Sequence, residues 1–291
     1  MLAGDQAASG RLAIIAGGGL LPHYLADAAR RNGENPLIIQ LLDEPAPVWH
    51  GFDVEEASVG DFAGMRRLFA RYSVSRVVLS GSVRRRPEWR QIRPTLGFLA
   101  TVPFVLKTLR RGGDNAVLEM VIGLLEALGC KVIGAHEIAP DLLAVQGPVG
   151  QLEPDAEAQE DIRVAIDAAL QLGRLDIGQG AVAVGGRVVA LEGPEGTDAM
   201  LARVAEMRTS GRLSRRRRGV LVKLAKPQQD ERADLPAIGL TTLKNASLAG
   251  LSGIVGEAGR SLILDRAELA SAADAAGMFV MGIEVVRPEV K

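Results

Sequence analysis

The residues best suited to chemistry lie in one charged stretch, GVLVKLAKPQQDERADLPAIG, which runs from Gly219 to Gly239. It begins as an apolar strand and then places Lys223 and Lys226 ahead of several carboxylates, the last of which is Asp234. Such a set suits a polyanionic ligand, because lysines neutralise phosphate while a carboxylate holds a divalent metal or polarises a water molecule. The competing interpretation is a solvated loop. We favour the functional one because Asp234 directly precedes an apolar turn, where a carboxylate is expected to lose water and to need a compensating cation.

Composition limits the class of protein. The chain has 291 residues, of which 47% are hydrophobic but only 3% aromatic, which indicates an aliphatic α/β protein, and its length favours two domains. With 34 basic and 35 acidic residues, no overall field attracts nucleic acid, and no nucleic-acid partner is expected. Cys130 is the only cysteine, which excludes an internal disulfide and fits the cytoplasm. No uninterrupted apolar run approaches about 18 residues, so neither a signal peptide nor a transmembrane helix is expected.

Strand and helix patterns alternate through the first half of the chain. An apolar strand over residues 12–16 leads into Gly17-Gly18-Gly19 and then into a helix with Pro22 in its first turn. The alternation continues to residue 138, which predicts a Rossmann-like parallel sheet with helices on both faces. Ligands of such sheets bind at the carboxyl ends of the strands. The loops expected at those ends carry Gly17–Gly19, Ser80–Ser82 and Ala135–Glu137.

The alternation stops near Ala139. Residues 140–154 are dotted with Pro, Gly and Asp and lack periodicity, which is typical of an interdomain linker. Helix and strand patterns then resume, with Thr197 or Asp198 expected to cap a helix. The predicted organisation is an N-terminal Rossmann-like domain over residues 11–139, the linker, and a C-terminal catalytic α/β domain over residues 155–291. Residues 1–10 are expected to form a disordered extension.

The glycine turn after the first strand has the position of a phosphate-cradling loop. Gly17 and Gly19 match the first two glycines of a dinucleotide fingerprint, but Pro22 stands in place of the third. The next strand ends in Gln40 rather than in a ribose-binding acid. A bound nicotinamide or flavin is therefore the weaker interpretation, beside contact with a substrate's diphosphate or sugar and beside a turn with no ligand. A nucleotide- or NAD-binding module without hydrolytic activity stays as the alternative function.

Arginine and histidine usage narrows the chemistry further. Two arginine clusters, at residues 84–86 and 215–218, adjoin predicted strand-end loops, where they are either a solvated face or a means of attracting phosphate or anionic lipid headgroups. Histidine occurs only at His23, His50 and His136, so the His-rich dinuclear phosphoesterase pattern and the His-based zinc signatures are absent. Any metal is then expected to be a hard cation such as Mg²⁺, held by carboxylates and phosphate oxygens.

Several segments occur together in an order typical of one family. They are IAGGGLLP, GAHEI, GRLDIGQGAV, EGTDAMLARVA, the AKPQQDERADLPAIGLTTLKNA run and AGLSGIVGEAGRSLILDR. Over almost its whole length the chain resembles the UDP-2,3-diacylglucosamine pyrophosphatases of lipid A biosynthesis, the LpxI family. The resemblance implies hydrolysis of that substrate to UMP and 2,3-diacylglucosamine 1-phosphate (lipid X), with water attacking the sugar-side phosphorus.

The resemblance also implies two α/β domains, a homodimer, a Mg²⁺ requirement, and a catalytic aspartate in the DLP element, here Asp234. We expect Asp234 to bind Mg²⁺ or to orient and deprotonate the attacking water. Lys223 and Lys226 are expected to stabilise charge on the phosphates. The expected partner is the lipid sugar nucleotide, met in the cytoplasm with peripheral contact at the inner-membrane surface, since lifting acyl chains from a bilayer exposes methylenes at about 0.8 kcal/mol each. The predicted substrate-binding residues are Gly18, Gly19, Leu20, Gly81, Ser82, His136, Gln179, Thr197 and Asp198.

Overall fold

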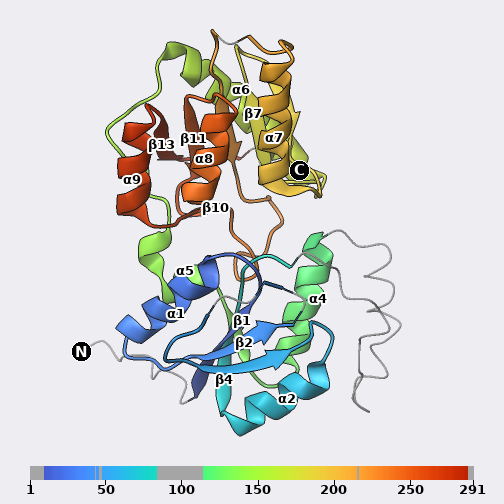
Figure 1. The fold of residues 1–291 in the computed structure, drawn as a ribbon. Helices are drawn as coiled ribbons and strands as arrows, with labels where there is room; N and C mark the ends of the chain where they lie inside the picture. The colour runs from blue at the N-terminus through green and yellow to red at the C-terminus, as the bar shows by residue number, and fades with distance from the viewer. Residues whose placement is uncertain (1–9, 43, 46–47, 84–113, 215, 288–291) are drawn as a thin grey trace, which may run out of the picture. The chain divides into compact units, whose positions relative to one another are not determined.

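The structure is a computed structural model that describes residues 10–42, 44–45, 48–83, 114–214 and 216–287. The chain forms two compact units (Figure 1). The first unit comprises Met1–Pro140 together with a separate segment, Asp230–Asp234, and the second comprises Asp141–Gln229 and Leu235–Lys291. Most of the predicted N-terminal extension and the arginines at 84–86 and 215 lie outside the described residues.

The first unit contains a parallel sheet of five strands in the order β3-β2-β1-β4-β5. The strands are β1 (Arg11–Ala16), β2 (Leu37–Leu41), β3 (Asp53–Ala57), β4 (Val74–Ser80) and β5 (Lys131–Ile133). This is the strand order of a Rossmann-like sheet. Successive strands are added on one side of β1 up to β3 and on its other side from β4 onward, so the strand order switches between β1 and β4. The predicted fold of this half is confirmed.

Helices cover both faces of the first sheet. α1 (Leu21–Arg31) and α2 (Phe62–Arg71) lie on opposite faces (Figure 1). α4 (Asp114–Glu126) shares a core with α2, where Phe69 and Leu125 pack with Ile15 of β1. Short α5 (Ala135–Ile138) follows β5. Because both faces are covered, all residues of β2 are buried, as expected for a central parallel strand.

The second unit contains a mixed five-stranded sheet in the order β13-β11-β9-β7-β8. The strands are β7 (Gly180–Ala183), β8 (Val188–Leu191), β9 (Val220–Lys223), β11 (Gly253–Glu257) and β13 (Phe279–Ile283). β9, β11 and β13 are parallel, β7 is antiparallel to β9, and β8 is antiparallel to β7. The carboxyl ends of β8, β9, β11 and β13 therefore share one edge with the amino end of β7.

Helices also cover both faces of the second sheet. The core on one face includes α6 (Ala156–Arg174), and the core on the other includes α7 (Gly196–Thr209), α8 (Leu240–Leu248) and α9 (Arg266–Ala275). The pleat of β9 explains this division, because Val222 enters the α6 core and Leu221 enters the α7–α9 core. By the same alternation, the Lys223 side chain starts on the side of Leu221, which is the α7–α9 face.

The aperiodic residues 140–154 are built into the second unit from Asp141 onward, so this unit begins before residue 155. They include a 3-10 turn, Pro140–Leu142, and the short β6 (Gly147–Pro148). Ala144 enters the core of the unit, and the Val149 amide donates to the Val280 carbonyl of β13 at 2.7 Å. Two-residue strands β10 (Ala237–Ile238) and β12 (Leu262–Ile263) form a separate parallel pair.

Candidate functional site

The loops after β1 and β4 are hydrogen-bonded to each other in the first unit. The Gly17 amide donates to the Ser80 carbonyl at 2.8 Å, and Gly18 and Ser82 exchange two backbone bonds of 2.8 and 2.9 Å. Gly81 has a φ of +88°, and a Cβ there would lie 2.6 Å from the Gly18 carbonyl oxygen, so only glycine fits. The amides of Gly17 and Gly18 are therefore already hydrogen-bonded to the loop after β4. Gly19 and Leu20 form the exposed part of the predicted binding turn.

The end of β2, where a ribose-binding acid would stand, is filled by internal contacts. Gln40 is buried and donates to the Ala16 and Leu41 carbonyls, both at 3.3 Å, while its side-chain oxygen accepts from the Trp49 indole at 3.1 Å. The Gln40 side chain is therefore already hydrogen-bonded within the protein, which disfavours the NAD-binding alternative. Glu44 follows in the same loop, with its buried carboxylate 3.2 Å from the position a Cβ of Gly18 would take.

Lys223 ends β9 with a buried charge. The residue is 6% exposed, and Nζ donates to the Ala237 carbonyl of β10 at 3.0 Å. Its register neighbours are glycines, Gly180 on β7 and Gly256 on β11, so neither flanking strand places a side chain beside it. Lys223 makes no ion pair within the described ranges. Because one neutral carbonyl compensates a buried ammonium only in part, Lys223 is suited to hold an anion at this edge of the sheet.

Two predicted substrate-binding residues, Gln179 and Thr197, lie at the same edge. A Cβ on Gly180 would stand 2.4 Å from the Glu192 carboxylate, which accepts a hydrogen bond from the Thr197 hydroxyl at 3.0 Å. Glu192 is 7% exposed. Its Oε2 and the Oε1 of Gln179 are buried, and neither has a hydrogen-bond partner among the residues that the structure describes. The edge next to Lys223 is therefore rich in acceptors.

The expected capping role of Thr197 or Asp198 is wrong. The N-cap of α7 is Glu195, and the helix already begins at Gly196, so both residues lie within its first turn. The Thr197 hydroxyl instead donates a hydrogen bond to Glu192, and the exposed Asp198 carboxylate accepts one from the Asn245 side chain at 2.8 Å.

Lys226 is paired with a carboxylate. Its Nζ lies 2.7 Å from the Asp176 carboxylate, and its amide donates to the Gln229 side chain at 3.0 Å. The preceding carbonyl, of Ala225, accepts from Arg287 at 2.9 Å, and Arg287 also pairs with buried Glu257 at 2.6 Å. The first half of the charged stretch is thus fixed to the second unit. Since Asp176 balances the charge of Lys226, Lys223 is the stronger candidate for a phosphate-binding cation.

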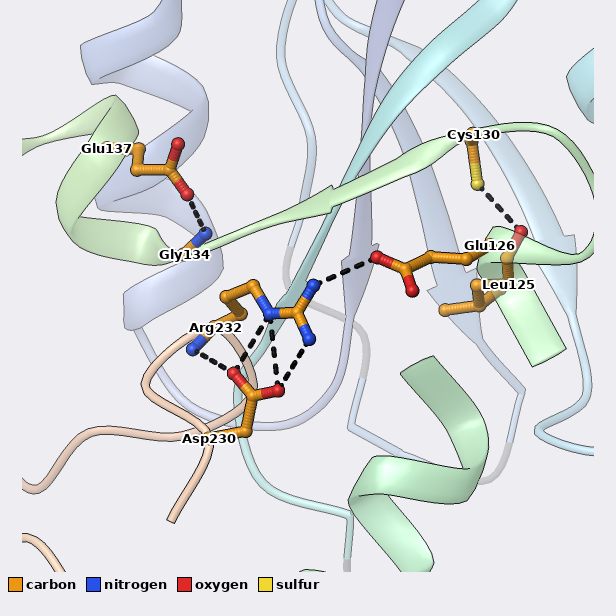
Figure 2. Close-up of polar contacts among 7 residues, drawn as sticks. All are labelled: Leu125, Glu126, Cys130, Gly134, Glu137, Asp230 and Arg232. Atoms are coloured by element: carbon orange, nitrogen blue, oxygen red, sulfur yellow. Dashed lines mark hydrogen bonds and ion pairs between the residues drawn. The ribbon is translucent and has the colours of Figure 1, made fainter. Parts of the chain in front are cut away.

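The following residues, Asp230–Asp234, count with the first unit. Arg232 folds back on the Asp230 carboxylate, with Nε at 3.0 Å and Nη2 at 2.7 Å, and its Nη1 reaches Glu126 of α4 at 2.9 Å (Figure 2). Hydrogen bonds from Arg232 lower the pKa of Asp230, which keeps that carboxylate ionised. Ala233 packs against the core that α2 and α4 share.

Asp234 is exposed at the end of this turn, with its amide 3.4 Å from the Asp230 carbonyl oxygen. The expectation that its carboxylate loses water against the apolar turn is therefore wrong. The chain becomes buried one residue later, at Leu235, which is 6% exposed. An exposed carboxylate keeps its charge in water and can reach a ligand from solution, so its predicted role does not depend on desolvation.

His136 lies near the same segment of the first unit. Its Nδ1 is buried and has no hydrogen-bond partner within the described ranges. A Cβ on Gly134 would stand 2.6 Å from that nitrogen and 3.3 Å from the Glu231 carbonyl oxygen. Gly134 therefore lets His136 and the Asp230–Asp234 segment approach the same point of the backbone after β5.

The predicted site residues fall into two groups. Gly18, Gly19, Leu20, Gly81, Ser82, His136 and Asp234 belong to the first unit, and Gln179, Thr197, Asp198, Lys223 and Lys226 to the second. Asp176, Glu192 and Arg232 are not among the predicted site residues. Their signal in the sequence is weak: Asp176 and Glu192 each stand in a glycine-rich turn, and Arg232 follows Asp230 by two positions, a spacing common in solvated loops.

A magnesium site would depend on few protein ligands. Within the described ranges, no group of three or more His, Cys, Asp or Glu is arranged to hold a metal ion. The Asp230 carboxylate is committed to Arg232, whereas Asp234 is exposed. Mg²⁺ is commonly bound through one or two carboxylates, substrate phosphates and its own waters. Asp234 fits that pattern as one carboxylate ligand completed by substrate.

The fold is that of a two-unit α/β protein, and within its second unit the buried Lys223 is suited to a phosphate-containing anion. The family model of the LpxI N-terminal domain matches residues 11–142, and that of the LpxI C-terminal domain matches residues 145–281. A curated relative from Caulobacter vibrioides, named UDP-2,3-diacylglucosamine pyrophosphatase LpxI, is 39% identical over 275 residues, which cover 94% of this chain and 98% of the relative. The chain belongs to the LpxI family.

Solved structures show only distant similarity. UDP-glucose 4-epimerase of Thermus thermophilus in complex with NAD is 14% identical, with 94% of this chain and 86% of that chain covered and a TM-score of 0.30. The enzyme WbmG of Bordetella bronchiseptica in complex with NAD is 20% identical, with 44% and 37% covered and a TM-score of 0.28. Such low scores carry no argument about ligands. Separately, no helix of the described residues is long and apolar enough to cross a membrane.

Proposed function

We propose that this protein hydrolyses the pyrophosphate bond of UDP-2,3-diacylglucosamine in lipid A biosynthesis, releasing UMP and 2,3-diacylglucosamine 1-phosphate. The observation that carries the proposal is the 39% identity to the Caulobacter vibrioides relative of that name, over nearly the full length of both chains. The charged stretch from Gly219 to Gly239 supports it, because a diphosphate substrate requires both cations and a carboxylate.

In this proposal Asp234 is the catalytic carboxylate. It orients a water molecule and accepts its proton while the water oxygen bonds to the sugar-side phosphorus and the bond from that phosphorus to the bridging oxygen breaks, so that UMP leaves. Asp234 would also hold Mg²⁺, which supplies neutralising charge to the phosphates when bound. The exposure of Asp234 supports both roles, since water and phosphate can reach its carboxylate.

Lys223 and Lys226 are assigned to the charge that develops on the phosphates. Lys223 is the stronger candidate because its ammonium is buried and, among the residues that the structure describes, donates a hydrogen bond only to the Ala237 carbonyl. Lys226 acts with Asp176, whose carboxylate fixes its position. The predicted binding residues Gly18, Gly19, Leu20, Gly81, Ser82, His136, Gln179, Thr197 and Asp198 are proposed to contact the nucleotide and sugar.

Magnesium dependence, a homodimer, and cytoplasmic action with peripheral contact at the inner-membrane surface complete the proposal. Purified protein with Mg²⁺ is expected to convert UDP-2,3-diacylglucosamine to UMP and the lipid monophosphate, and EDTA is expected to abolish turnover. Mass spectrometry of both products after reaction in ¹⁸O-water identifies the attacked phosphorus, with the label expected in the lipid monophosphate. Absence of both products at saturating Mg²⁺ would refute the enzymatic assignment, and NAD that stays bound through gel filtration would favour the alternative.

A further inference from the structure

Arg232 joins two carboxylates that belong to different parts of the first unit. Its guanidinium lies between Asp230, on its own turn, and Glu126, at the end of α4 (Figure 2). Nε and Nη2 engage Asp230 from one side of the guanidinium, and Nη1 donates to Glu126 Oε1 at 2.9 Å. The Arg232 amide also donates to the Asp230 carboxylate at 3.0 Å. We call these three residues the Arg232 clamp.

The clamp fixes the backbone from which Asp234 extends. The Asp230 carbonyl oxygen accepts from the amides of Ala233 and Asp234, at 2.9 and 3.4 Å. Holding the Asp230 side chain against Arg232 therefore also sets the carbonyl to which the Asp234 amide points. Through Glu126 the same guanidinium ties this turn to α4, and Ala233 adds an apolar contact with the core below.

We propose that Arg232 is a positioning residue for Asp234, acting through Asp230 and Glu126. The inference rests on the proposed function, in which Asp234 is the catalytic carboxylate. A displacement of about 1 Å in a catalytic group can lower turnover by roughly a hundredfold, because reacting atoms must be held in a narrow geometry. Removal of the clamp is therefore expected to affect turnover more than substrate binding.

The exposure of the clamp separates this role from simple stabilisation. The side chains of Arg232 and Glu126 are both 39% exposed and that of Asp230 is 21% exposed. Ion pairs as exposed as this contribute little to the free energy of unfolding, since water and salt screen them. Lysine cannot replace the forked geometry, because its ammonium is a single point charge and cannot engage Asp230 and Glu126 as the planar guanidinium does.

The test compares Arg232→Gln, Arg232→Lys and Glu126→Gln with a matched control, Arg163→Gln. Arg163 also forms an exposed ion pair, with Glu160 on α6, but belongs to the second unit. We expect Arg232→Gln to lower kcat at least tenfold with KM within about threefold of the wild-type value and an unchanged melting temperature. Arg232→Lys should fall between Arg232→Gln and the wild type, Glu126→Gln should have a smaller effect, and Arg163→Gln should behave as the wild type.

A double-mutant cycle and hydrogen exchange complete the experiment. Glu126→Gln should add little to Arg232→Gln, because Glu126 acts through that guanidinium. Amide exchange in peptides that span residues 230–234 should be faster in Arg232→Gln, whether or not substrate is turned over. Wild-type kcat in Arg232→Gln, or additive losses in the cycle, would overturn the positioning role and leave the proposed function standing. If the wild-type protein releases no UMP, the proposed function fails, and unchanged exchange in Arg232→Gln would then overturn the clamp itself.

Discussion

The carboxyl edges of the two sheets are built from different chemistry. In the first unit, the loops after β1 and β4 meet through backbone hydrogen bonds between Gly18 and Ser82, and Gly81 is shaped for that contact. In the second unit, the corresponding edge carries buried charge, with Lys223 at the end of β9 and Glu192 after β8. One edge uses glycine to bring backbone together, and the other uses glycine to make room for charged side chains.

This difference indicates what each edge can do for an anionic substrate. Backbone groups at fixed positions carry no formal charge, so they can hold a ligand only through shape and hydrogen bonds. A buried ammonium suits a phosphate, because its field is weakly screened. The charged stretch starts at the second edge and supplies its later residues, Asp230–Asp234, to the first unit. If this comparison holds, variants of the charged stretch should damage rate, and variants of the glycine loops should damage the fold.

Asp234→Ala is expected to have the largest effect on rate. Loss of a carboxylate that orients and deprotonates water should lower turnover by roughly a hundred- to ten-thousandfold. The melting temperature should change little because Asp234 is exposed. Substrate binding should also change little because, in the proposed function, this carboxylate faces an anionic ligand. Steady-state kinetics at matched Mg²⁺, with Glu231→Ala as the control carboxylate, measures the effect. Near-normal turnover in Asp234→Ala together with an inactive Glu231→Ala would reassign the roles.

Lys223→Met is expected to have the second-largest effect on activity, a loss of roughly a hundredfold in kcat/KM. Both KM and kcat should change, because a cation beside phosphate acts in the ground state and in the transition state. Methionine is similar in size and removes a partly compensated buried charge, so thermal stability should not fall. Lys226→Met is the matched variant, and its effect should be smaller because Asp176 already balances that charge. Equal losses in both variants would show that burial does not distinguish the two lysines.

Gly81→Ala tests the backbone edge. A Cβ at this position would require a left-handed backbone and would stand 2.6 Å from the Gly18 carbonyl oxygen, so the free energy of unfolding should fall by roughly 1–3 kcal/mol. Gly33→Ala is the control, since its φ of +81° gives similar backbone strain with no atom within 4 Å of the added Cβ. Chemical denaturation of both variants separates collision from strain. Equal destabilisation would mean that the contact between the two loops is unimportant.

The smallest effect is expected at Cys130, whose buried thiol donates to the Leu125 carbonyl at 3.0 Å. Burial raises the pKa of Cys130 to about 11 from its ordinary value near 9. The unfolded chain therefore releases this proton first as pH rises, so the thiol's contribution to the free energy of unfolding should decline between about pH 9 and 11. Denaturation across this range should show a steeper decline in the wild type than in Cys130→Ala. Parallel curves would contradict the raised pKa.

The sequence by itself determined the α/β class, the Rossmann-like first half and the family, because these depend on local periodicity and on motifs that are contiguous in the chain. It also located the charged stretch and the glycine turn. Such patterns report the order of elements and the spacing of residues within them. For this reason Gly17–Gly19 and the start of the site at Lys223 are recognisable from the order of residues alone.

Only the tertiary structure decided how the charges are used. Arg232 meets Glu126 across 106 positions of sequence, and Lys226 meets Asp176 across 50, so neither pair leaves a local signal. The same is true of Lys223, whose register neighbours on the two adjacent strands are Gly180 and Gly256. Asp234 was expected to be desolvated by its apolar neighbours, yet the turn held by Arg232 leaves it exposed. Pairing and exposure arise from packing between distant segments, and that packing is fixed only when the whole chain folds.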